Sequence, residues 1–96
     1  MEIEDRDLII NDNCDFDFFY LTIEKAKKLK VDIIEIINDF DTMYCDLIYK
    51  DLQFTLHYNI YDGLSLYPKN IKSATEVENI TAKELVDFLK TQLHEE

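Results

Sequence analysis

His57 is the residue of this sequence that is best suited to chemistry, and it lies in the middle of an alternating segment, residues 52–60. A two-residue turn at 50–51 would place Tyr44 opposite His57 and Asp46 diagonal to it. A histidine that is oriented by a carboxylate can act as a general base. That task also needs a nucleophile or an oxyanion donor, and the sequence contains no recognisable arrangement of either. We therefore expect a protein that is not an enzyme, and we keep catalysis by His57 as a third hypothesis.

Acidic residues gather in two short stretches where a metal ion could be considered. They are Asp12, Asp15 and Asp17 in the first stretch, and Asp39, Asp41 and Asp46 in the second. A calcium loop of the EF-hand type needs its acids at fixed spacing, with a central glycine and a terminal glutamate, and neither stretch has that pattern. The sequence also contains no glycine-rich phosphate loop and no Cys-x-x-Cys motif. We expect no metal and no cofactor, and we interpret these acids as loop and capping residues.

The cysteines and the N-terminal residues indicate the cellular compartment of the protein. Cys14 and Cys45 are the only two cysteines, and a small secreted domain usually carries more. Glu2 and Glu4 open the chain with negative charge, which is the opposite of a basic signal-peptide start. No apolar run approaches the length of a membrane-spanning helix. We expect a cytoplasmic protein with two free thiols and no membrane contact.

Net charge is the strongest signal in the composition, since 21 acidic residues against 10 lysines and arginines give −11 at pH 7. Direct binding to DNA or RNA is disfavoured, because each phosphate would be repelled without a gain from counterion release. The same field would accelerate encounter with a basic protein. An alternative is that the acidity only maintains solubility. The one basic patch, Lys25, Lys27, Lys28 and Lys30, is explained as favourable charge at a helix C-terminus.

The first third of the chain predicts a strand, a helix and an ambiguous segment. Residues 7–11 are typical of a short strand, and Asp15 is a plausible N-cap. An apolar stripe at helical spacing follows, formed by Phe16, Phe19, Tyr20, Ile23, Ala26 and Leu29. Residues 31–38 keep helical spacing in part, but their β-branched residues favour a buried strand. We interpret them as a strand.

Two hairpins are predicted after this segment. The turn at 50–51 pairs Tyr49 with Leu52, Leu47 with Phe54 and Cys45 with Leu56, so that every apolar residue lies on one face. For the second hairpin we expect a three-residue loop, residues 61–63, in which Gly63 supplies the left-handed conformation. That loop pairs Ile60 with Leu64 and Tyr58 with Leu66, and it places Tyr67 beside His57. The strand ends at Pro68.

The last helix is predicted to begin at Thr81, after a polar loop over residues 69–79. Thr81 and Glu84 match a capping box, with Ile80 and Leu85 at the positions of a hydrophobic staple. The buried stripe of this helix is Leu85, Phe88, Leu89 and Leu93.

These elements predict one acidic α+β domain over residues 1–96. We expect a two-layer sandwich of the order β-α-β-β-β-α, with a mainly antiparallel sheet and two helices packed on one face. If the first two strands are neighbours, the helix between them would make that pair parallel and right-handed.

The sheet face without helices is the expected binding surface. Tyr44, His57 and Tyr67 would form an aromatic row across three strands, surrounded by acidic and polar residues that include Asp41, Asp46 and Asn59. Tyrosines at a surface favour interfaces, although cross-strand aromatic pairs can simply stabilise a sheet.

The most favoured function is non-catalytic protein binding. Its sharpest form is an immunity or inhibitor protein that neutralises a basic bacterial toxin such as a nuclease. The alternative is a self-associating structural or regulatory subunit, in which case the chain would form a homo-oligomer.

Overall fold

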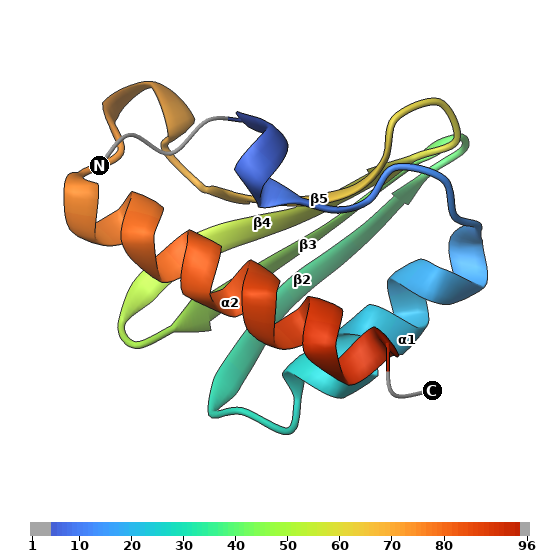
Figure 1. The fold of residues 1–96 in the computed structure, drawn as a ribbon. Helices are drawn as coiled ribbons and strands as arrows, with labels where there is room; N and C mark the ends of the chain where they lie inside the picture. Colours follow the sequence, from blue (N-terminus) through green and yellow to red (C-terminus); the bar gives the residue numbers. More distant parts are fainter. Residues whose placement is uncertain (1–4, 95–96) are drawn as a thin grey trace.

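The chain forms two layers, with a curved sheet in one and two helices in the other (Figure 1). This computed structural model describes residues 5–94, so the expectations that involve Glu2 and Glu4 lie outside the described residues. The helices are α1 (Phe16–Ala26) and α2 (Glu76–His94), and 3₁₀ turns occupy Asp5–Leu8 and Ile71–Ser73. The strands are β1 (Ile9–Asn11), β2 (Val31–Asp39), β3 (Thr42–Tyr49), β4 (Leu52–Asn59) and β5 (Gly63–Pro68).

The sheet is antiparallel throughout and has the order β1-β5-β4-β3-β2, which confirms the predicted α+β class. Four strands lie between the helices, one more than the predicted order β-α-β-β-β-α counts, although each of the four segments is itself predicted as a strand. The first two strands are not neighbours, and no parallel pair forms among residues 5–94. Since β2 to β5 are joined by successive hairpins, the free side of β5 is where β1 pairs, with Ile9 opposite Ser65. The first strand begins at Ile9, because Asp5–Leu8 forms a 3₁₀ turn.

Helix α1 begins where the sequence predicts, and its cap explains why. The Phe18 amide donates a hydrogen bond to the Asp15 carboxylate, at 3.1 Å. Phe19, Ile23 and Ala26 of the predicted stripe are buried beneath the helix. One part of the expected basic patch is wrong, since Lys25 is buried while Lys27, Lys28 and Lys30 are exposed.

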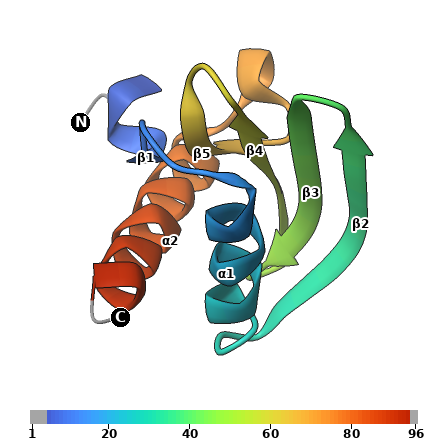
Figure 2. The ribbon, with the colours of Figure 1, turned by 90° about the vertical axis from the view of Figure 1, so that its right-hand side faces the viewer.

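Residues 31–38 form a strand, as predicted, but the expectation that this strand is buried is wrong. Strand β2 is the outermost strand, at the opposite edge of the sheet from β1 (Figure 2). Its residues are exposed except for Val31 and Ile33, which are half-buried. In this view β2 curves away from α1, so most of the strand has no helix over it.

The β3–β4 hairpin has the predicted register, in which Tyr49 faces Leu52, Leu47 faces Phe54 and Cys45 faces Leu56. Both turn residues have positive φ, 53° at Lys50 and 63° at Asp51. This is the backbone of a type I′ turn, which matches the twist of the strands although neither residue favours it.

The β4–β5 hairpin differs from the prediction by two residues. Asn59 pairs with Gly63 and Tyr58 with Leu64, so the three-residue loop comprises residues 60–62. The Asn59 side-chain oxygen accepts hydrogen bonds from the amides of Tyr61 and Asp62, at 2.9 and 2.6 Å, and these bonds organise the loop at this position. A shift of two residues leaves each side chain on its predicted face, so Leu64 still points into the core.

Helix α2 begins at Glu76, five residues earlier than predicted, because a different Thr-x-x-Glu segment forms the capping box. The Glu78 amide donates to the Thr75 hydroxyl at 3.1 Å, and the Thr75 amide donates to the Glu78 carboxylate at 3.0 Å. Thr81, the predicted cap, is a buried residue within the helix. No helix within residues 5–94 is long and apolar enough to cross a membrane.

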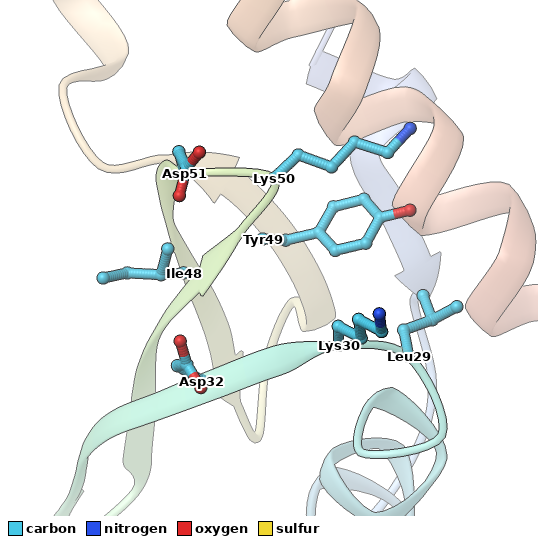
Figure 3. A pocket seen from close by; sticks show the side chains of 7 residues that line it. All are labelled: Leu29, Lys30, Asp32, Ile48, Tyr49, Lys50 and Asp51. Atoms are coloured by element: carbon cyan, nitrogen blue, oxygen red, sulfur yellow. The ribbon is translucent and has the colours of Figure 1, made fainter.

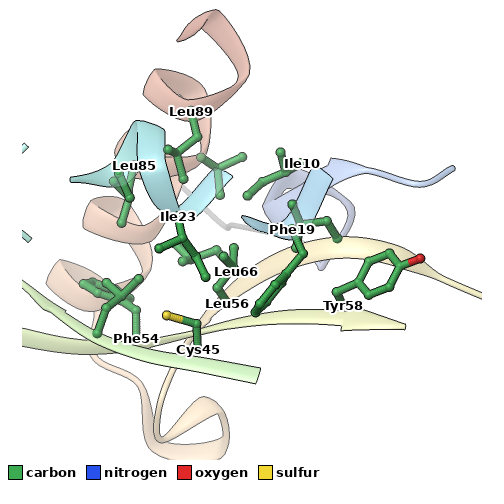
Figure 4. Packing of buried hydrophobic residues seen from close by; sticks show 14 of the residues in the cluster. Ile10, Phe19, Ile23, Cys45, Phe54, Leu56, Tyr58, Leu66, Leu85 and Leu89 are labelled. Carbon is green, nitrogen blue, oxygen red and sulfur yellow. The ribbon is translucent and has the colours of Figure 1, made fainter. Parts of the chain in front are cut away.

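The core lies between the sheet and the two helices (Figure 4). Phe54 and Leu56 point from the sheet toward Leu85 and Leu89 of α2, as the alternation in the sequence predicts. The Tyr58 hydroxyl leaves this core and donates a hydrogen bond to the backbone carbonyl of Cys14, at 2.9 Å. The buried layer therefore fixes which strand residues must face away from the helices.

Candidate functional site: the open face of the sheet

One face of the sheet has no helix packed against it, and we call its side chains the open face (Figure 2). They alternate with the core residues along each strand, and the strand registers place them together. The open face comprises Asp32, Glu35, Ile37 and Asp39 of β2; Thr42, Tyr44, Asp46 and Ile48 of β3; Gln53, Thr55, His57 and Asn59 of β4; and Ser65 and Tyr67 of β5.

Charge is distributed very unequally between the two faces of the sheet. Every acidic residue within strands β2 to β5 lies on the open face, namely Asp32, Glu35, Asp39 and Asp46. The same four strands contain no lysine and no arginine. The open face is therefore acidic, and it offers a complementary surface to cations.

Two of these acids are opposite each other, since Glu35 and Asp46 are Cα partners across β2 and β3. Like charges at directly opposite positions destabilise a sheet. Asp46 is partly compensated, because it accepts a hydrogen bond from the Thr55 hydroxyl at 2.8 Å and lies 3.6 Å from the Lys69 ammonium. Glu35 is exposed, so its charge is the more accessible of the two.

Tyr44 and His57 are cross-strand partners as predicted, and their ring centroids lie 5.0 Å apart. Burial lowers the pKa of His57, while the nearby Asp62 carboxylate opposes that shift. His57 is therefore a neutral imidazole at neutral pH, and it adds no positive charge to this acidic surface.

The predicted row of three aromatic residues is not a straight row. Because of the shifted β4–β5 register, Ser65 is opposite His57, and Tyr67 is opposite Thr55 in the next row. Tyr67 is still on the open face, diagonal to His57. The structure thus brings the three aromatic residues onto one surface, with Ser65 in the place expected for Tyr67.

A serine opposite a histidine invites a test for catalytic geometry. No hydrogen bond joins the Ser65 hydroxyl to His57 within the described part of the chain. The Asp46 carboxylate, expected to orient His57, accepts its hydrogen bond from Thr55 instead. Neither of the two hydrogen bonds of a Ser–His–Asp arrangement is therefore formed among these residues.

Asp41 and Asn59 lie near this surface but have local structural contacts. Asp41 is in the β2–β3 turn, and its carboxylate accepts a hydrogen bond from the Thr42 hydroxyl at 3.3 Å. Asn59 accepts from two loop amides and donates to the Asp62 carboxylate at 3.1 Å. Its side chain is committed to the 60–62 loop and is less available to a ligand than the sequence indicates.

A shallow pocket of about 520 Å³ lies at the β1 end of the open face. It is lined by Ile9, Asp12, His57, Tyr61, Asp62, Ser65 and Tyr67. Its charged residues are the two aspartates, and among residues 5–94 no three histidine, cysteine or acidic side chains are placed to share a metal ion.

A second pocket, of about 440 Å³, lies where β2 begins and β3 ends (Figure 3). Leu29, Ile48 and Tyr49 supply its apolar lining, while Lys30 and Lys50 balance two aspartates. The Lys50 ammonium lies 5.4 Å from the centre of the Tyr49 ring. The two lysines and two aspartates of this lining give it no net charge, so the pocket favours neither cationic nor anionic ligands.

The two cysteines are free thiols, and both are poor nucleophiles in this fold. Burial, together with the neighbouring carboxylates Asp15 and Asp46, raises the pKa of Cys14 and of Cys45 to about 11. The thiolate, which is the reactive form, is therefore scarce at neutral pH.

Sequence reasoning missed the contribution of β2 to the open face. The sequence predicts a buried strand over residues 31–38, and this prediction leaves Asp32, Glu35 and Ile37 outside the site. A signal was present, because a strand buried on both faces does not accommodate Asp32 and Glu35 without partners.

Comparison with known families, curated proteins and solved structures gave no significant match to this chain.

Proposed function

We propose that this chain is a non-catalytic protein-binding domain whose open face docks a basic protein. The observation that carries this proposal is the Glu35–Asp46 pair, two carboxylates held opposite each other on a surface without lysine or arginine in its strands. A cation from a partner would relieve their repulsion. This loss of repulsion between Glu35 and Asp46 would favour binding, in addition to the long-range attraction between a basic protein and a chain of net charge −11.

The aromatic residues of the open face complete the surface in a way that suits a protein partner. The Tyr44 and His57 rings lie 5.0 Å apart at a tilt of 37°, and Tyr67 lies diagonally beyond His57. Tyrosine contributes contact area and a hydroxyl at low entropic cost, and protein interfaces are enriched in it. The acidic residues of β2 and β3 border this aromatic centre on the side of β2, so charged side chains lie next to an aromatic patch.

The sharper form of the proposal is an immunity or inhibitor protein of a basic toxin such as a nuclease. Carboxylates on a rigid sheet can substitute for substrate phosphates and occupy a basic substrate channel. The short antiparallel hairpins of β2 to β5 provide that rigidity, since they hold the acidic residues in a fixed register. Binding would then neutralise the toxin within the cell that makes it.

The proposal is tested by affinity capture from the source cells with two variants of equal charge. The open-face variant carries Asp32→Asn, Glu35→Gln and Asp39→Asn. The control carries Glu24→Gln, Glu76→Gln and Asp87→Asn, three exposed acids of α1 and α2. We expect the wild type and the control to capture the same basic protein, which is released when NaCl rises from about 50 to about 500 mM.

Equal capture by the open-face variant would overturn the open face as the docking surface. An acidic captured protein, or one that stays bound in high salt, would overturn charge as the basis of recognition. If the captured protein is toxic when expressed alone and harmless when this chain is co-expressed, the immunity function is supported.

A second candidate function, self-association, is favoured by the apolar residues exposed along β2. Ile36 and Ile37 are 44% and 42% exposed, and Phe40, directly after the strand, is 94% exposed. Apolar association persists or strengthens as salt rises, whereas charge-steered binding weakens. Size-exclusion chromatography of the chain alone at the same two salt concentrations distinguishes these functions.

A further inference from the structure

The outer edge of β2 is the largest unpaired backbone edge that the described residues form. Strand β2 has nine residues and pairs only with β3, whereas β1, at the other edge, has three residues. An exposed edge presents a row of free amide and carbonyl groups to any chain that can align with it. Proteins usually shorten or protect such edges, so a long free strand is a candidate for pairing with a partner.

Apolar side chains are exposed along this same strand. Ile34 in the bulge of β2 is 53% exposed, and Ile36 and Ile37 point to opposite faces of the sheet. On β3, by contrast, Cys45 is fully buried opposite Ile36. An added strand would cover these isoleucines on both faces, which is the burial that β2 lacks in the free protein.

Charge selects the kind of strand that would fit. Strand β2 carries Asp32, Glu35 and Asp39 and contains no lysine or arginine. A second copy would bring six acidic residues together along one new strand pair, in addition to the repulsion between two chains of charge −11. A segment that alternates lysine or arginine with apolar residues would place its cations against the acids of the open face.

We propose that β2 accepts a sixth strand from the basic partner, an extended segment in which basic and apolar residues alternate. Backbone hydrogen bonds along the edge supply affinity, and the acids of the open face select basic side chains. This inference rests on the proposed function, because it names the element of the partner that the protein recognises. It adds a separate requirement, since docking on the open face alone needs no backbone contact with β2.

One amide of β2 allows this requirement to be tested. Asp39 pairs with Thr42 across the two-residue turn at 40–41, and residues that flank such a turn exchange hydrogen bonds. The amide of the preceding residue, Asn38, therefore points away from β3, toward the free edge. Asn38→Pro removes this donor without removing a bond of the β2–β3 ladder, and Asn38→Ala keeps the donor as a matched control.

The probe is a blocked peptide about nine residues long, the length of β2, in which lysine and valine alternate. The control peptide has glutamate in place of lysine. Binding to the full isotope-labelled chain is followed through backbone amide shifts and hydrogen exchange in about 50 mM NaCl. We expect the lysine peptide alone to shift β2 amides and to slow exchange at Asn38.

The variants are expected to separate backbone pairing from simple charge attraction. Asn38→Ala should bind the lysine peptide like the wild type, and Asn38→Pro should bind it about tenfold more weakly. Glu35→Lys, a change at an exposed side chain, provides a second variant that should also weaken binding. Unchanged core amide shifts show that each variant is folded.

Three other outcomes would overturn this inference, and they separate it from the proposed function. If shifts centre on Tyr44 and His57 and Asn38→Pro binds normally, the edge is not used, although open-face docking stands. If neither the lysine peptide nor polylysine shifts any amide, the proposed function fails too. If β2 amides are protected in the free protein at high concentration and lose protection on dilution, a second copy occupies the edge.

Discussion

Glu35 and Asp46 are direct partners across strands β2 and β3, so two carboxylates are held opposite each other on the open face. Such a pair costs a sheet roughly 0.2–1 kcal/mol. Lys69 and Thr55 reduce the cost on the Asp46 side only. Local arrangements that oppose stability concentrate at functional sites, and this pair is the one in the sheet that a cationic partner would relieve.

Neutralising Glu35 should therefore stabilise the free protein. We expect Glu35→Gln to raise the free energy of unfolding by about 0.5 kcal/mol at low salt, and the gain should shrink as salt screens the repulsion. Urea denaturation measures the change. Glu24→Gln is the control with the same change in charge, and it should cost a few tenths of a kcal/mol, because it removes the exposed ion pair with Lys27. A loss of stability in Glu35→Gln would contradict the repulsion.

The capping box of α2 gives a second prediction. Thr75→Ala removes the side-chain acceptor of the Glu78 amide and should lower the free energy of unfolding by about 1 kcal/mol. Glu84→Ala, at the box that the sequence pattern suggests, should change it by less than about 0.5 kcal/mol, since Glu84 lies on the exposed surface. Equal losses in the two variants would place the helix start at Thr81.

Gly63 should tolerate no side chain. Its φ of 80° lies in the left-handed region, and an added Cβ would come within 2.7 Å of the Asp12 Cα and still closer to the Asn11 carbonyl oxygen. Both contacts are backbone atoms that cannot move aside, so Gly63→Ala should cost about 2 kcal/mol or more.

The opposite change at another left-handed position checks this explanation of Gly63. Asp51 has a φ of 63°, and Asp51→Gly should gain roughly 0.5 kcal/mol. Thermal unfolding followed by circular dichroism compares the two variants. A stable Gly63→Ala variant would show that the backbone of Asn11 and Asp12 does not lie against Gly63.

His57 makes stability depend on pH in a defined direction. Burial lowers its pKa in the folded protein below the ordinary value of 6.5, so the unfolded chain binds more protons between these two values. The contribution of His57 is therefore fully favourable above pH 6.5, and it falls as pH decreases toward the lowered pKa. We expect His57→Gln to flatten the pH dependence of unfolding between about pH 5 and 7. An unchanged slope would mean that His57 is solvated as in the unfolded chain.

Periodic patterns in the sequence predict most of the elements correctly, because they reflect a local balance between core and solvent. Apolar and polar residues alternate over 52–60 and also over 43–50. These two alternations define the β3–β4 register, since a slip by one residue would expose Phe54 or Leu56. The start of α1 is also a local feature. The Asp15 carboxylate accepts a hydrogen bond from the amide of Phe18, which is only three residues away in the chain. The pattern is weaker for α2, where two Thr-x-x-Glu segments compete.

The sequence by itself determined which side of β3, β4 and β5 faces the helices, because burial of alternate residues is a property of the strand alone. Only the tertiary structure decided the order of the strands, and it placed β2 at an edge where Asp32 and Glu35 reach solvent. It also decided that Ser65 rather than Tyr67 is opposite His57, since a two-residue shift leaves the alternation intact. The β4–β5 register and the order of the strands are not recorded in the alternation of any one strand, because they depend on how separate segments pair.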